Sequence, residues 1–311
     1  MANRSTMHTP IQSEAARYQQ ALRSLSRRYM LLVIAVALLA VTAIAILYSE
    51  ELSGQVASYW RSLDDMFFIF LLGGFVAQLI DGSLGMAYGV SASTFLMSFG
   101  VPPAAASASI HTAEIFTSGI SGLSHLKFRN VNKKLFRTLL IPGILGAVMG
   151  AYLLTSFEEY NNIIRPIVAV YTLILGAIII RKALVLRTQK KKTRNVPALA
   201  AVGGFMDSVG GGGWGPVVAT TLIAKGRSPR YTIGSVNLAE FFISFSSSLT
   251  FFATTGISHI QIIAGLVIGG ALAAPIAAYF THRLPVKRMM LIVGVVIVLV
   301  SIRLIIVSLT H

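Results

Sequence analysis

The feature that most constrains this chain is a glycine-rich stretch that occurs twice in one register. The first copy begins at Asp81 and the second at Asp207, and a constant offset of 126 residues (207 − 81) aligns them without a gap. In both copies an apolar segment reaches the lone aspartate, glycines follow, and a second apolar segment starts at Tyr88 or Trp214. Glycine is unfavourable inside a helix and common at tight turns. Each copy therefore predicts two short helices joined at a glycine tip.

The repeat extends well beyond these tips. The same offset carries a Gly-x-x-Pro pattern at 100–103 onto the same pattern at 226–229, and it carries Glu114 onto Glu240. So many identities in one register indicate an internal duplication, which constrains the fold before any single motif does.

The composition is that of a protein that crosses a membrane several times. Of 311 residues, 55% are hydrophobic and 12% are charged, against about 25% charged in an ordinary soluble domain. Several apolar stretches approach the ~20 residues that a helix needs to cross a bilayer, and the alternation typical of a membrane β-barrel is missing. We therefore predict an all-α, polytopic membrane protein. Because the chain has no cysteine, a disulfide, a thiolate metal site and a cysteine nucleophile are excluded.

The basic residues indicate which ends of the helices face the cytoplasm. The formal net charge is +15, and 23 of the 26 Lys and Arg fall in five clusters, each between apolar segments or before the first. Cytoplasmic loops of membrane proteins carry such an excess, and anionic lipid headgroups attract it. We therefore expect contact with the lipid bilayer and no nucleic-acid partner. The clusters are residues 1–29, 125–137, 181–195, 224–230 and 282–288.

The chain divides into four parts, which are a basic cytoplasmic extension at 1–29, an extra transmembrane helix at 30–48, a first repeat at 66–182 and a second at 196–308. A cleaved signal peptide is the alternative for the N-terminal part, but its polar stretch is too long and no small-residue cleavage site follows. Each repeat is predicted to hold one glycine-tipped hairpin of short helices and three transmembrane helices. The helices are expected over 66–80, 88–99, 103–124, 135–155 and 162–181, then over 196–209, 214–224, 230–253, 259–280 and 288–308.

The number of crossings predicts the orientation of the repeats. Each hairpin starts and ends on the same side of the membrane, whether its short helices re-enter or span by tilting. The three other helices of each repeat cross the membrane an odd number of times, so the second repeat starts on the opposite side and is inverted relative to the first. Two inverted repeats with broken helices are typical of secondary transporters. We expect a multi-pass protein of a cell membrane, such as a bacterial inner membrane, with the N-terminus cytoplasmic and the C-terminus outside.

Four acidic residues lie inside apolar segments and form two repeat-related pairs, which are Asp81 with Asp207 and Glu114 with Glu240. A carboxylate inside a bilayer is costly, and it is a functional candidate by default. These four side chains are predicted either to couple transport to protons or to stabilise the hairpins. In the second role they hydrogen-bond the free backbone N–H groups of the broken helices, which must be satisfied within the protein.

His111 precedes Glu114 by three residues, so both lie on one helix face, and the repeat counterpart of His111 is Asn237. A histidine here can titrate or donate a hydrogen bond to a substrate, and a packed, satisfied histidine is the alternative. No metal site is expected, because no second His or Cys stands at ligand spacing.

The glycine tips predict an anion site. The second helix of each hairpin starts at the tip with unpaired N–H groups and a partial positive charge, and such a start binds anions without Lys or Arg. Small hydroxyl side chains nearby can add donors, although helix packing is their commoner use in membranes. The candidate substrate-binding residues are Gly82, Ser83, Gly85, Tyr88, Gly89, Ser91, His111, Gly210, Gly211, Gly212, Gly213, Trp214, Gly215 and Asn237.

With its two glycine tips, each followed by a short helix and Gly-x-x-Pro, the chain over about 66–308 resembles the sulfite exporter TauE/SafE family, also called the 4-toluene sulfonate uptake permease family. The second tip fits the family pattern through Gly210–Gly213 and Pro216, whereas the first has Val90 in place of that proline. The resemblance implies transport of sulfite or small organosulfonates, often outward. The residues by themselves predict an anion site, but they do not identify the anion as a sulfur compound.

We therefore predict a secondary transporter that moves a small anionic substrate, by resemblance sulfite or a small organosulfonate, by alternating access and with possible coupling to protons. An anion channel with the same tips lining a pore is the alternative. An enzyme is not expected, because no nucleophile–base set, HExxH or cofactor motif is present. No cofactor is expected either.

Overall fold

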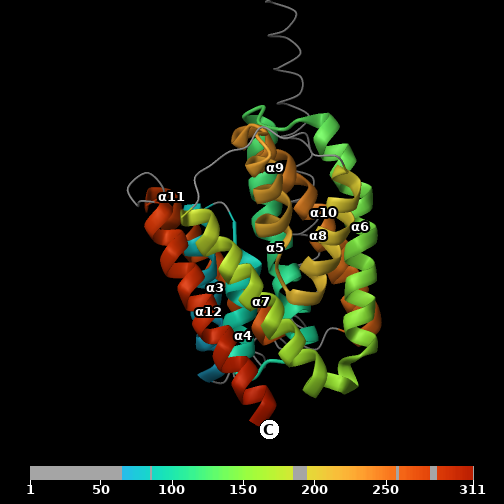
Figure 1. Cartoon of the computed structure of the whole chain (residues 1–311), viewed down its shortest axis with the longest axis vertical. Coiled ribbons are helices and arrows are strands. Elements are labelled where there is room, and N and C mark those ends of the chain that lie inside the picture. Colours follow the sequence, from blue (N-terminus) through green and yellow to red (C-terminus); the bar gives the residue numbers. More distant parts are fainter. Residues whose placement is uncertain (1–64, 85, 185–194, 257–258, 281–285, 311) are drawn as a thin grey trace, which may run out of the picture. The chain divides into compact units, whose positions relative to one another are not determined.

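The structure is a computed structural model, which describes residues 65–84, 86–184, 195–256, 259–280 and 286–310 (Figure 1). All of these belong to one compact unit, Asp64–His311. Within the described ranges every regular element is a helix, which confirms the all-α prediction. The predicted extension at 1–29 and helix at 30–48 lie outside the described residues.

The helices follow the predicted order in both halves. The first half holds α3 (Asp65–Leu84), α4 (Tyr88–Ser98), α5 (Pro103–Lys127), α6 (Lys133–Ser156), the short 3-10 turn η1 (Glu158–Tyr160) and α7 (Asn161–Leu184). The second half holds α8 (Val196–Gly210), the π-helix η2 (Trp214–Ala219), α9 (Thr220–Ala224), α10 (Pro229–Thr255), α11 (Ile260–Phe280) and α12 (Val286–Thr310).

The repeated Gly-x-x-Pro pattern ends one helix and starts the next in both halves. Gly100 and Gly226 each have a φ of +89°, a left-handed conformation that suits glycine and stops a helix. Pro103 and Pro229 then occupy the first turns of α5 and α10, where the missing N–H of proline costs nothing. The pattern therefore sets two equivalent helix boundaries.

The first tip differs from its prediction. The helix expected over 66–80 continues to Leu84 and has 20 residues, about 30 Å at 1.5 Å per residue, so it is not short. Its glycine and serine are accommodated in the last turn, and the left-handed turn falls on Ala87 (φ +86°). At the second tip the left-handed residue is Gly211 (φ +65°), and the next helix begins as a π-helix that contains Pro216.

Helix pairing between the halves is reciprocal. α3 packs along α11, and α8 packs along α6. The repeat offset carries α3 onto α8 and α6 onto α11, so these two contacts are equivalent. α5 packs along α10, and α7 along α12, which joins equivalent helices of the two halves (Figure 1). This is the pairing that a duplicated unit related by two-fold symmetry gives.

Glycines allow the first two of these pairs to approach closely. A methyl group added to Gly74 or Gly269 would lie 2.0 to 2.4 Å from a carbonyl oxygen across the α3–α11 contact. One added to Gly146 or Gly204 would lie 2.0 to 2.2 Å from a carbonyl oxygen across the α6–α8 contact. Small residues at such contacts are the usual means by which membrane helices pack.

Four of the described helical segments are long and apolar enough to cross a membrane, namely Lys133–Ser156, Glu158–Leu184, Pro229–Thr255 and Lys287–Ser308. Their outward faces carry large exposed apolar side chains, for example Ile141, Leu249 and Leu299, each at least 60% exposed. Such surfaces suit contact with lipid rather than with water.

Candidate functional site

The two glycine tips touch each other through their backbones. A methyl group added to Gly89 would lie 2.6 Å from the carbonyl oxygen of Gly211, and one added to Gly212 would lie 2.2 Å from the carbonyl carbon of Gly89 and the nitrogen of Val90. The glycines were expected to let an anion approach the backbone. Here, two of them first let the tips approach one another.

A cavity of about 250 Å³ lies beside this contact. Its wall includes four carboxyl groups, and among the residues that the structure describes no lysine or arginine lines it. Two buried side-chain atoms of lining residues, the Tyr88 hydroxyl and the Gln78 side-chain carbonyl oxygen, have no hydrogen-bond partner within the described part of the chain. These are groups that a bound molecule can satisfy.

Both aspartates cap the helix that follows their tip. An oxygen of Asp81 accepts from the backbone N–H of Tyr88 (3.3 Å), and an oxygen of Asp207 accepts from the backbone N–H of Trp214 (2.8 Å). This is the geometry that the hairpin-stabilising alternative describes. Consequently, at least one N–H group of each helix start is bonded to a carboxyl group of the protein and not to an incoming anion.

The second tip is held by side chains from the first half. The Tyr171 hydroxyl donates to the carbonyl of Gly212 (3.0 Å), and the Ser93 hydroxyl donates to the carbonyl of Gly210 (2.7 Å). A methyl group on Gly210 or Gly213 would lie within 2.0 Å of the Tyr171 side chain. Sequence reasoning missed Tyr171 and Ser93, and their only signal is a polar group inside an apolar helix.

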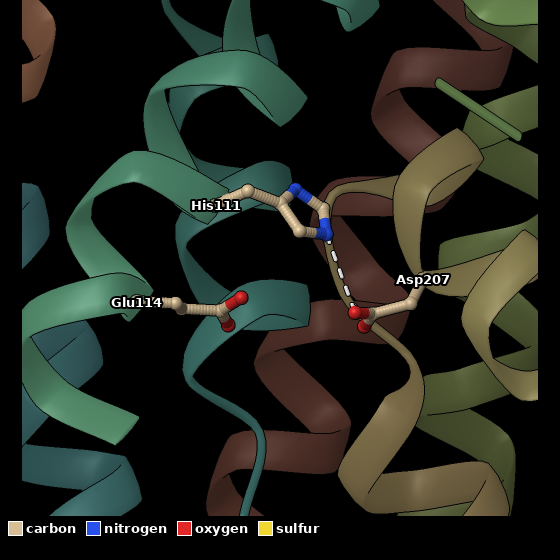
Figure 2. Close-up of side chains that lie close together, drawn as sticks. All are labelled: His111, Glu114 and Asp207. Atoms are coloured by element: carbon tan, nitrogen blue, oxygen red, sulfur yellow. Dashed lines mark hydrogen bonds and ion pairs between the residues drawn. The ribbon is translucent and has the colours of Figure 1, made fainter. Parts of the chain in front are cut away.

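Three side chains converge next to the second tip (Figure 2). His111 and Glu114 come from α5 and Asp207 from α8, and one side-chain nitrogen or oxygen atom from each of the three lies within 4.8 Å of the other two. The Nε2 of His111 is 3.2 Å from Oδ2 of Asp207, and the Ser244 hydroxyl donates to Glu114 (3.2 Å). His111, Glu114 and Asp207 are buried, with exposed fractions of 0%, 4% and 1%.

Hydroxyl groups form a seam where α5 meets α8 and α10. Ser107 donates to the carbonyl of Ser208 (2.5 Å), and the hydroxyls of Ser208 and Ser247 are 2.6 Å apart. Thr112 reaches the Ser248 hydroxyl at 3.4 Å and also lies 2.7 Å from the carbonyl of Ala108 on its own helix. We call this set of side chains the hydroxyl seam.

The predicted site residues fall into three groups. Those that line the cavity are Asp81, Tyr88, Gly89, Glu114, Asp207, Gly212, Gly213, Gly215, Asn237 and Glu240. Those that are described but do not line it are Ser91, His111, Gly210, Gly211 and Trp214. Gly82 and Ser83 lie in the last turn of α3, and Gly85 lies outside the described residues.

Trp214 is the clearest difference from the expected contacts. It was expected to contact substrate, yet its side chain is fully buried and its indole N–H donates to the carbonyl of Val236 (3.1 Å). It anchors the start of η2 against α10. Conversely, Gln78, Thr117, Ser118, Ser121 and His125 line the cavity although none was a candidate.

Comparisons with known proteins identify a family and a curated relative. The sequence pattern of the family described as "Sulfite exporter TauE/SafE" matches residues 69–304. The chain is also similar to the "Probable membrane transporter protein YtnM" of Bacillus subtilis (strain 168), with 39% identity over 245 residues, which cover 76% of this chain and 81% of that protein. No solved structure matches the chain.

Proposed function

Because the chain belongs to the Sulfite exporter TauE/SafE family and is thus a membrane transporter, we propose that it moves sulfite or a small organosulfonate through the cavity between its tips. The movement is outward, by alternating access, and is coupled to protons. The cavity is the natural binding site in this proposal, because it lies where the two broken helices meet.

The observation that carries the proposal is the unpartnered hydroxyl of Tyr88. Tyr88 is 4% exposed, lines the cavity and has no hydrogen-bond partner for its hydroxyl among the described residues. A buried polar group without a partner costs about 1–3 kcal/mol. An oxyanion in the cavity supplies the missing acceptor.

The charge of the cavity explains why protons must accompany the anion. Asp81, Glu114, Asp207 and Glu240 line it without a lysine or arginine within the described chain. At an effective dielectric constant of about 20, an ionised carboxylate about 5 Å from an anion repels it by roughly 3 kcal/mol. Protonation of one of these groups removes its share of the repulsion, so a proton enters with the anion and the net charge that crosses the membrane falls.

The contacts at the two ends of the helices support the proposed inverted topology. Arg230 donates to the side chain of Asn130, which joins two loops that both carry basic clusters. At the opposite helix ends, His259 lies within electrostatic range of Glu158. Both residues belong to helix connections without a basic cluster, which the same charge pattern assigns to the outer side. Each contact therefore pairs segments for which the charge pattern predicts the same side of the membrane.

The experiment measures sulfite movement into and out of liposomes that contain the purified protein. With an imposed pH gradient, sulfite should accumulate against its own gradient, and dissipation of the pH gradient should release it. An open anion channel would only equilibrate sulfite, so movement that never exceeds equilibrium would overturn the coupled transporter. No movement of sulfite or of any small organosulfonate would overturn the assigned substrate class.

A further inference from the structure

We propose that His111 and Asp207 share the coupled proton, and that this proton links α5 of the first half to the tip of the second. The inference rests on the proposed function, since it locates within that site the proton that moves with the anion. It also changes the expected role of His111, which is a proton-sharing residue here and not a substrate contact.

The first step is the tautomer of His111. Its Nδ1 lies 2.8 Å from the backbone carbonyl of Ser107, which can only accept, and 3.3 Å from the Ser107 hydroxyl. That hydroxyl already donates its proton to the carbonyl of Ser208 (2.5 Å), so it too acts as an acceptor toward His111. Both neighbours therefore require Nδ1 to carry a hydrogen.

The second step concerns the other ring nitrogen. With the hydrogen of a neutral imidazole on Nδ1, Nε2 presents a lone pair to Oδ2 of Asp207 at 3.2 Å (Figure 2). Two acceptors at this distance repel unless a proton lies between them. The pair therefore holds one proton beyond the neutral imidazole and the ionised carboxylate, written either as imidazolium with carboxylate or as imidazole with carboxylic acid.

Titratable groups on several helices surround the pair. Glu114 on α5 and Glu240 on α10 are acidic groups within electrostatic range of Asp207, and both are also within electrostatic range of Asp81 on α3. Tyr171 on α7 lies within electrostatic range of Asp207 and donates its hydroxyl proton to the carbonyl of Gly212. Tyr88 on α4 lies within electrostatic range of Glu114 and Asp81. His125 also lines the cavity, and no described lysine or arginine does so.

The third step connects the proton to the anion site. Asp207 bonds His111 through Oδ2 and the backbone N–H of Trp214 through Oδ1. The residues between Asp207 and Trp214 in the sequence include Gly212 and Gly213, which line the cavity. Loss of the proton from Nε2–Oδ2 would leave two acceptors facing each other, which separates the tip from α5. Release of the proton thereby releases the wall of the anion site.

The other half of the molecule lacks this pair and so offers a matched control. Asp81 occupies the equivalent register and makes the equivalent cap to Tyr88. Asn237, the counterpart of His111, instead donates to the hydroxyl of Ser121 (2.9 Å). If a capping aspartate only stabilises its hairpin, then Asp81→Asn and Asp207→Asn should act alike, because asparagine keeps an oxygen for the cap.

The experiment compares Asp207→Asn, His111→Asn and Asp81→Asn in the full chain. In liposomes, the ratio of protons to sulfite is measured from the pH change that accompanies a known sulfite flux. We expect Asp207→Asn and His111→Asn to lower this ratio by about one proton per sulfite and to lose accumulation driven by the pH gradient. Asp81→Asn should keep the ratio, whatever its effect on the rate.

A second measurement does not depend on transport. Nitrogen NMR of the protein with labelled histidine identifies the His111 signals as those lost in His111→Asn. We expect a protonated Nδ1 and an Nε2 signal that moves in Asp207→Asn but not in Asp81→Asn. A hydrogen on Nε2 with a bare Nδ1 would overturn the inference even if sulfite transport is confirmed, and the expected signals would uphold proton sharing even if sulfite is not the substrate.

Two further outcomes would also overturn the proposal. Equal proton-to-sulfite ratios in Asp207→Asn and Asp81→Asn would show that the aspartate acts only as a cap. A stoichiometric divalent metal in the purified protein, removed by a chelator together with the characteristic Nε2 signal, would show that a metal ion and not a proton joins the pair.

Discussion

Substitution of Gly212 by alanine tests the contact between the two tips. The added methyl group would lie 2.2 Å from the carbonyl carbon of Gly89 and from the nitrogen of Val90. Ordinary contact for such a carbon begins near 3.4 Å, so the deficit is 1.2 Å (3.4 − 2.2). Gly212 is not among the described glycines with positive φ, so the cost comes from space and not from backbone conformation.

The size of the effect follows from this deficit. Both atoms that the methyl group meets are backbone, which cannot rotate away as a flexible side chain can, so the tips must separate by roughly an ångström. Overpacking of this kind costs about 1–3 kcal/mol. At roughly 2–4 °C per kcal/mol for a chain of this size, Gly212→Ala should lower the melting temperature by several degrees and impair sulfite transport.

The assay is thermal unfolding of the purified protein in detergent together with sulfite flux in liposomes. Gly270→Ala is the matched control, because the nearest atom to its added methyl group is 3.8 Å away and alanine favours the helix by about 1 kcal/mol. The control should unfold at or above the wild-type temperature. Wild-type melting and wild-type flux in Gly212→Ala would refute the tip-to-tip contact.

Three further predictions concern single residues. Tyr88→Phe should weaken sulfite binding by roughly ten- to a hundredfold in calorimetry, because a hydrogen bond to a charged group contributes about 1.5–3 kcal/mol. It should not lower the melting temperature, and unchanged affinity would remove Tyr88 from the site. Burial lowers the pKa of His259, an effect that Glu158 partly offsets. The unfolded chain therefore binds this proton more readily, and stability should fall as the pH drops below about 6.5. His259→Gln should flatten that decline in melting temperature, and an identical decline in the variant would contradict the prediction. A single cysteine at Lys134, which is exposed, should react with an impermeant maleimide only from the cytoplasmic side, and reaction from outside would reverse the predicted topology.

Features that depend on local sequence were predictable. The Gly-x-x-Pro patterns predicted the boundaries at Gly100 and Gly226, since a left-handed glycine and a first-turn proline act on their own neighbourhood. The repeat predicted that Asp81 and Asp207 occupy equivalent positions, and the two caps that the structure shows are equivalent. The length of α3 was underestimated, because the glycine and serine after Asp81 do not by themselves end a helix that is supported by α11.

Contacts between distant segments were not predictable from one sequence. His111 was placed beside Glu114 by helical spacing, but the partner of its Nε2 atom, Asp207, lies 96 positions away on another helix. Tyr171 holds Gly212 across 41 positions, and nothing near Tyr171 in the sequence distinguishes it from other aromatic residues in apolar helices. The cavity depends on such distant pairs, so the acids could be named from the sequence and their partners could not.

The hydroxyl seam has a consequence for how fast the transporter can turn over. A serine or threonine in a helix can donate either across the interface or to a carbonyl one turn back on its own helix, and Thr112 lies within reach of both acceptors. If α5 and α10 slide or part, the Thr112 hydroxyl can therefore exchange one acceptor for the other without a stage at which it is left unbonded. An interface built from leucine would lose its packing contacts on separation. An interface built from charged pairs would leave desolvated charges without partners. In the proposed alternating access, a seam of hydroxyls would therefore let α5 and α10 part and rejoin with fewer lost bonds than either alternative.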